Sequence, residues 1–210
     1  MDSLARLIEG FSSFRQHYFK DNPQLYRELT EVGQSPEALV IACCDSRVHP
    51  ALVFNTQPGD IFVIRNVANL VPPCQDDGKS HGTSAAIEFA VKHLKVSHII
   101  ILGHAQCGGI ISLMEGVHQD VKHGFIDPWM SMAMPARELV LERYPEKTFA
   151  EQCRACEQAS IKISLKNLMT FPWIKQKVES GELALHGWYF DIEQGALLAC
   201  NQADGSFIPV

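Results

Sequence analysis

The sequence lacks a long hydrophobic run. No apolar stretch approaches the roughly 20 residues that a membrane-spanning helix requires. The first residues also lack the basic start and continuous apolar segment of a secretory signal. We therefore expect a protein without membrane spans and, from its N-terminal segment, a cytoplasmic location.

The sequence has fewer positively charged residues than negatively charged ones. The chain has 18 Lys and Arg residues against 24 Asp and Glu residues, which gives a formal net charge of -6. A surface of this sign repels nucleic acid and anionic membranes, so we expect neither as a partner. Internal repeats and low-complexity linkers are absent as well. With 210 residues, of which 46% are hydrophobic, the sequence predicts a single domain over residues 1–210 with a substantial core.

The sequence has seven cysteines, an odd number. Because the chain shows no export signal, we expect these cysteines to be reduced thiols and not a disulfide framework. Two of them form a C-x-x-C motif, Cys153 and Cys156, inside a helix predicted over residues 149–168. A redox motif would stand where a strand leads into a helix. We interpret this pair as two small apolar residues on one helix face.

Apolar, β-branched runs at residues 38–41, 61–64 and 98–102 are typical of buried parallel strands, and a helical pattern follows each run. Residues 185–192 and 196–200 flank a turn and predict a hairpin. The fold class is therefore α/β: about four parallel strands plus an antiparallel edge strand, flanked by helices. Within the single domain we expect an α/β core over residues 36–200.

Residues 1–31 form a separate N-terminal helical extension in this prediction. Apolar residues recur at helical spacing, and Pro23 divides the segment into two helices. Two amphipathic helices ahead of the first strand need a surface to cover. That surface is either their own domain or a partner subunit, and we expect the partner subunit.

Two loops follow predicted strands and carry the reactive side chains. The first contains Cys43, Cys44, Asp45 and Arg47, and the second contains His104 and Cys107. Loops after parallel strands meet at the carboxyl edge of an α/β sheet. Either Cys43 or Cys44 would join His104 and Cys107 there, and thiolates with an imidazole favour zinc.

The residue pairs in these two loops also have simpler interpretations. A His-x-x-Cys pair fits a buried cysteine beside a core histidine, and an Asp-x-Arg pair fits a surface ion pair worth about 0–1 kcal/mol. The context favours the metal site, because the His104 motif follows a strand and precedes Gly108 and Gly109.

The linked motifs make the chain similar to the β-class carbonic anhydrases. The resemblance rests on Cys43-x-Asp45-Ser46-Arg47, on His104-x-x-Cys107, and on residues 64–71 and 82–88, and it extends from about Gln34 to the final hairpin. It implies a zinc enzyme with Cys43, His104 and Cys107 as ligands, which leaves Cys44 as the variable residue.

The same resemblance implies a mechanism. A zinc-bound hydroxide would attack carbon dioxide in a reversible hydration to bicarbonate and a proton. Asp45, held by Arg47, would orient that hydroxide, or would take the fourth zinc position itself in a closed state.

The resemblance also implies a small substrate pocket at a dimer interface. Gln34 corresponds to its amide donor, Phe62 and Val67 to apolar walls, and Phe89 to a position where some relatives carry tyrosine. We expect a homodimer or a higher homo-oligomer. Two alternatives remain: hydrolysis of a carbon dioxide analogue such as carbonyl sulfide or carbon disulfide, and a non-catalytic zinc-stabilised binding protein.

Overall fold

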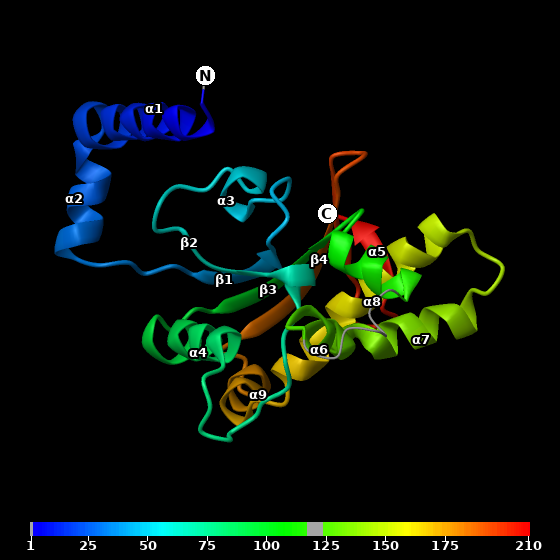
Figure 1. The fold of residues 1–210 in the computed structure, drawn as a ribbon. Coiled ribbons are helices and arrows are strands. Elements are labelled where there is room, and N and C mark those ends of the chain that lie inside the picture. Colours follow the sequence, from blue (N-terminus) through cyan, green and yellow to red (C-terminus); the bar gives the residue numbers. More distant parts are fainter. Residues whose placement is uncertain (1, 117–123) are drawn as a thin grey trace.

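The computed structural model describes residues 2–116 and 124–210 and is built on a six-stranded sheet (Figure 1). The spatial order is β2-β1-β3-β4-β5-β6. The strands span β1 Ala38–Cys43, β2 Ile61–Asn66, β3 His98–His104, β4 Ala184–Asp191, β5 Ala196–Cys200 and β6 Phe207–Pro209. The first four strands in spatial order run parallel, β5 pairs antiparallel with β4, and β6 pairs antiparallel with β5.

The strand register brings the two motif loops together. Ala38 on the central strand β1 pairs with Ile61 on β2 and with His98 on β3, so the three strands start level. They also end level, since Cys43 pairs with Asn66 at the end of β2. The loops after β1 and β3 therefore leave the sheet at the same edge, as the sequence predicts.

The helices have the following bounds: α1 Ser3–Arg15, η1 Gln16–Asp21, α2 Pro23–Glu31, α3 Pro50–Val53, η2 Val67–Asn69, α4 Gly82–Glu88, η3 Phe89–His93, α5 Gly108–Glu115, α6 Ile126–Met130, η5 Ser131–Ala133, α7 Met134–Arg143, α8 Phe149–Leu168 and α9 Pro172–Glu179. In the part of the chain that the structure describes, no helix is both long and apolar enough to cross a membrane.

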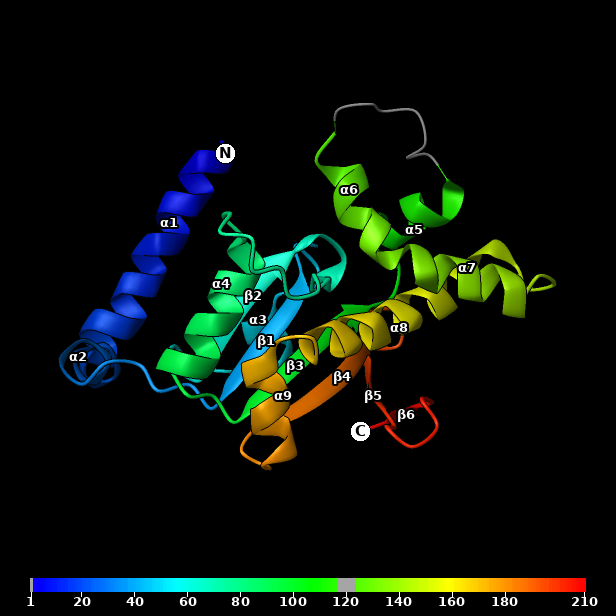
Figure 2. The same cartoon turned by 90° about the horizontal axis from the view of Figure 1, so that it is seen from below.

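One face of the sheet is covered by α4, α8 and α9 (Figures 1 and 2). The helix α8 lies against β3 at Gly103, where an added Cβ would stand 2.6 Å from the Ile161 side chain. This close approach explains the glycine. On the opposite face Val40 and Leu102 are buried, and partly buried side chains such as Phe54 pack against them.

The N-terminal helices α1 and α2 extend away from this body (Figures 1 and 2). None of the residues in either helix is buried. The apolar stripe on α1 is open: exposed fractions are 64%, 70%, 68% and 61% for Leu4, Leu7, Ile8 and Phe11. Pro23 is the first residue of α2, as predicted. On its own, this chain leaves the stripe of α1 uncovered, whereas Leu29 of α2 lies beside Gly59 of its own domain.

Three details differ from the sequence prediction. The strand β6 was not expected, because a three-residue segment carries little periodic signal. Apolar residues at spacings of three and four predict one helix over residues 127–144, but the structure divides this segment into α6, η5 and α7, with a proline at the start of α7. The sequence also predicts a helix over residues 110–117. In the structure this helix begins earlier, at Gly108, and its predicted last residue, Val117, lies outside the described residues.

Candidate metal centre

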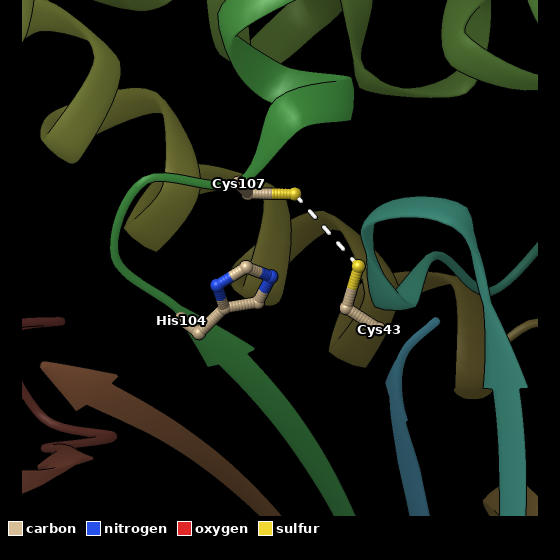
Figure 3. Close-up of side chains that lie close together, drawn as sticks. All are labelled: Cys43, His104 and Cys107. Carbon is tan, nitrogen blue, oxygen red and sulfur yellow. Dashed lines mark hydrogen bonds between the residues drawn. The ribbon is translucent and has the colours of Figure 1, made fainter. Parts of the chain in front are cut away.

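Three side chains from two strand ends and one helix start meet at the carboxyl edge of the sheet (Figure 3). Cys43 ends β1, His104 ends β3, and Cys107 is the residue before α5. All three are buried, and their ligand atoms lie within 4.8 Å of one another. The two sulfur atoms are 4.0 Å apart. The group thus has the size and chemistry of a zinc site.

His104 presents one unpaired ring nitrogen to this group. Its Nδ1 lies 2.8 Å from the carbonyl oxygen of Ala105. A carbonyl only accepts, so Nδ1 carries the hydrogen and Nε2 carries the lone pair. Nε2 is buried and has no hydrogen-bond partner among the described residues. A buried acceptor without a partner costs free energy, which a metal ion bound at Nε2 would remove.

The two thiols interact strongly. The hydrogen bond from Cys107 holds the pKa of Cys43 well below its usual range, and the same contact, together with burial, raises the pKa of Cys107. The ionisation of each sulfur atom therefore depends on that of the other. A metal ion bound between them would replace thiol hydrogen, since cysteine ligates as the thiolate.

The structure distinguishes Cys43 from Cys44. Cys43 is buried in the group, whereas Cys44 is exposed. Arg65 holds the backbone of the loop that runs from Cys43 to Asp45. Its Nε donates to the carbonyl of Cys43 at 2.9 Å, and its Nη2 donates to the carbonyl of Asp45 at 2.7 Å. Sequence reasoning missed this role of Arg65, which depends on the neighbouring strand β2.

Asp45 and Arg47 form a bidentate pair. Arg47 donates from Nε to Oδ1 at 2.9 Å and from Nη2 to Oδ2 at 2.7 Å, and its backbone N–H also donates to Oδ1 at 2.9 Å. These bonds hold the pKa of the Asp45 carboxyl well below its usual range. The carboxylate is thus ionised and held by Arg47, and it is not part of the Cys-His-Cys group.

A buried carboxylate supports the Cys107 backbone. Glu157 on α8 accepts from the Cys107 backbone N–H at 3.0 Å and from the Tyr189 hydroxyl at 2.7 Å. Burial raises the pKa of Glu157. Sequence reasoning missed this role of Glu157, because a lone acid inside an amphipathic helix gives no signal of what it will contact.

Gly109 lets the start of α5 approach the end of β2. A Cβ at Gly109 would stand 2.9 Å from a methyl carbon of Val67. Trp129 on α6 fixes this turn by donating from Nε1 to the Val67 carbonyl at 2.8 Å. Of the four predicted pocket residues, Val67 is therefore the one that packs beside the metal-ligand loop.

The other three lie toward the opposite end of the strands. Phe62 pairs with Leu39 on β1, four residues before Cys43, which is about 13 Å at 3.3 Å per residue. Phe89 packs on Phe62 with ring centroids 5.9 Å apart. Gln34 is exposed and precedes β1. A single chain does not bring these three side chains to its own Cys-His-Cys group.

Cys153 and Cys156 lie inside α8, as the sequence predicts, and both are buried. Burial raises the pKa of Cys153 to about 11 and that of Cys156 to about 12. They share a hydrophobic cluster with Cys43 and Cys107 but do not belong to the ligand group. Thiols with such pKa values are protonated at neutral pH and poorly reactive.

Comparison with known proteins agrees with this picture. The family model described as carbonic anhydrase matches residues 38–197. Beta carbonic anhydrase 3 of Arabidopsis thaliana is 36% identical over 93% of this chain and 76% of its own length. Beta carbonic anhydrase 5, chloroplastic, of the same plant is 42% identical over 90% of this chain, which spans only 62% of that relative.

Solved structures agree as well. The beta-carbonic anhydrase CcaA superposes with a TM-score of 0.90 at 34% identity, covering 100% of both chains. One of two tetrameric beta-carbonic anhydrases from Sordaria macrospora gives 0.82 at 31% identity, covering 99% of this chain and 100% of that one. Fold and site define an α/β protein with a buried Cys-His-Cys centre. The chain belongs to the carbonic anhydrase family, in its β class, and is accordingly a lyase.

Proposed function

We propose that this chain catalyses the reversible hydration of carbon dioxide to bicarbonate and a proton, with zinc as its metal. The observation that carries the proposal is the buried Cys43, His104 and Cys107 group, with a free His104 Nε2, beside the ion-paired Asp45 and Arg47. Membership of the β class supports the reaction. The donor set of two sulfurs and one nitrogen supports zinc.

In this proposal Cys43, His104 and Cys107 hold the ion. A bound zinc ion supplies Lewis acidity, which lowers the pKa of a water molecule enough for it to act as the nucleophile. Two thiolates balance the +2 charge of the ion. Glu157 and the carbonyl of Ala105 keep the backbone of Cys107 and the ring of His104 in position.

Asp45 orients the nucleophile. Its Oδ1 accepts two hydrogen bonds from Arg47, whereas its Oδ2 accepts one. A lone pair on Oδ2 is therefore available for the hydrogen of the attacking hydroxyl group. Arg47 holds the carboxylate ionised and in one orientation, so the hydroxyl oxygen can direct a lone pair at the carbon of the substrate.

We further propose a homodimer with a shared pocket. Gln34, Phe62 and Phe89 lie away from the Cys-His-Cys group of their own chain, so a partner subunit would supply them to it. The open apolar stripe on α1 would cover the partner, which makes residues 1–31 an arm and residues 36–200 the catalytic core. The tetrameric relatives from Sordaria macrospora support an oligomer in general.

Neither alternative gains support. The relatives reported above are named as carbonic anhydrases and not for a carbon dioxide analogue. A non-catalytic zinc protein would close its site with a fourth protein ligand, but Asp45 is paired with Arg47 instead.

The dyad provides the test. Arg47→Ala and Asp45→Asn should each keep close to one zinc per chain, because neither removes a ligand. Both should lower kcat for hydration by roughly 10- to 1,000-fold, because the nucleophile loses its orientation. Stopped-flow hydration and metal analysis measure the two quantities. Wild-type rates in both variants would make the pair structural and overturn the mechanism.

A further inference from the structure

We propose that Gln106 and Glu193 form a positioning pair that holds the Arg47 guanidinium, and through it Asp45, in place for catalysis. The inference rests on the proposed role of the Asp45 and Arg47 dyad. Neither Gln106 nor Glu193 touches the reacting atoms, so both act through Arg47.

Arg47 is held from two sides. Asp45 binds one edge of its guanidinium. On the other side the Arg47 Nη2 donates to the Gln106 carbonyl at 2.9 Å, and Nη1 lies 3.5 Å from the Gln106 side-chain oxygen Oε1. The Arg47 side chain is 47% exposed, so water competes for these groups. An exposed ion pair by itself is weak and poorly ordered, and additional fixed acceptors are needed to define its geometry.

Glu193 sets the direction of the Gln106 amide. The Gln106 Nε2 donates a hydrogen bond to Glu193 Oε1. A carboxylate accepts only, so the amide must turn its NH2 group toward Glu193. Its oxygen then faces Arg47. Without Glu193 the amide is free to flip, and an NH2 group facing the guanidinium would repel it.

Glu193 is itself anchored in the fold. Its backbone N–H donates to Asp191 Oδ1 at 3.0 Å, and Asp191 is buried at the end of β4. Arg154 on α8 donates to Asp191 Oδ2 at 2.9 Å and lies 3.7 Å from Glu193 Oε2. The contacts therefore run from the dyad through Gln106 to a buried acid of the sheet.

The topology explains why these residues meet. Strands β3 and β4 are neighbours, and His104 pairs with Phe190 near their ends. Gln106 and Glu193 each follow the end of their strand by two residues, so both lie at the same edge of the sheet. Gln106 also adopts a positive φ of 56°, which is unfavourable for a residue other than glycine and is typical of constrained functional loops.

A charge swap tests the pairing. Glu193→Gln leaves two amides whose orientation is not fixed, and Gln106→Glu places two carboxylates face to face. We expect each to lower kcat for hydration by about three- to tenfold, with KM and zinc content unchanged. The double variant restores an acceptor facing Arg47 and a donor at position 193. It should return to within about twofold of the wild-type kcat.

A second readout does not depend on activity. The Nε–H of Arg47, assigned by comparison with Arg47→Ala, should exchange slowly with solvent in the wild type when followed by NMR. Its exchange should quicken in each single variant and slow again in the double variant. Glu146→Gln, which makes the same acid-to-amide change at an exposed turn, is the control and should change neither kcat nor exchange.

The two proposals can fail separately. A wild-type protein that does not hydrate carbon dioxide would overturn the proposed function, and the Arg47 exchange rates would still test the pairing. Single variants with wild-type exchange, or a double variant as impaired as the two single changes combined, would overturn the positioning role of Gln106 and Glu193.

Discussion

At the scale of single residues, Cys43 and Cys44 differ in burial although they are neighbours. The Cys43 sulfur lies 4.0 Å from that of Cys107, whereas Cys44 is exposed. We expect Cys43→Ser to retain less than about a tenth of the wild-type zinc, because serine does not provide a thiolate. Cys44→Ser should retain close to one zinc per chain. Metal analysis of both purified variants checks this, and the reverse result would contradict the ligand assignment.

The buried pair in α8 gives a second prediction at this scale. With pKa values raised to about 11 and 12, Cys153 and Cys156 remain protonated thiols at neutral pH. The double change to alanine should leave zinc content and hydration rate within about twofold of wild type, at a cost in stability of about 1–3 kcal/mol for the lost packing. Activity that disappeared in this variant while the protein stayed folded would show that the thiols take part in catalysis.

Much of the site at residue scale could be predicted from sequence. Cys43, His104 and Cys107 follow strands that the apolar runs identify, and parallel strands bring their loops to one edge. The contacts of Arg65, Glu157 and Gln106 could not be predicted in the same way. They depend on which strands are neighbours and on where α8 crosses the sheet. The spacing of residues along the sequence predicts neither.

At the scale of elements, the helix α8 shows when local sequence is sufficient. The sequence predicts a helix over residues 149–168, and the structure has the same bounds. Thr148 and Glu151 form a capping box that fixes the start. The strand β6 has no comparable signal, because its three residues are ordered by pairing with β5 and not by their own pattern.

The junction between α5 and the end of β2 yields a prediction about packing. In Gly109→Ala the new Cβ would stand 2.9 Å from Val67 and 3.3 Å from both Ala68 and Met130. We expect a loss of about 1–3 kcal/mol from this overpacking. Gly108→Ala is the matched control, because nothing lies within 4 Å of its Cβ. Thermal unfolding compares the variants, and equal melting temperatures would contradict the tight junction.

At the scale of the whole molecule, the N-terminal arm exposes apolar side chains that its own chain does not cover. No residue of α1 or α2 is buried, although α1 carries four large apolar side chains with exposed fractions of 61–70%. A stripe of this kind is stable when another surface covers it. Together with the separation of Gln34 and Phe62 from the Cys-His-Cys group, this predicts that activity requires an oligomer.

We therefore expect sedimentation at no less than twice the chain mass of 23.4 kDa. Phe11→Glu places a charge in the apolar stripe and should shift the protein toward monomer with a parallel loss of hydration activity. Ser12→Glu adds the same charge beside it at an exposed position and should leave assembly intact. A monomer with full activity would contradict a pocket shared between subunits.

The central claim is that the Cys43, His104 and Cys107 group holds a zinc ion on which hydration of carbon dioxide depends. The most direct measurement is stopped-flow hydration by the full chain before chelation, after removal of the metal, and after return of one zinc per chain. We predict loss of activity with the metal and recovery with zinc, without loss of the fold. Equal hydration rates in the metal-free and zinc-loaded protein would contradict the account.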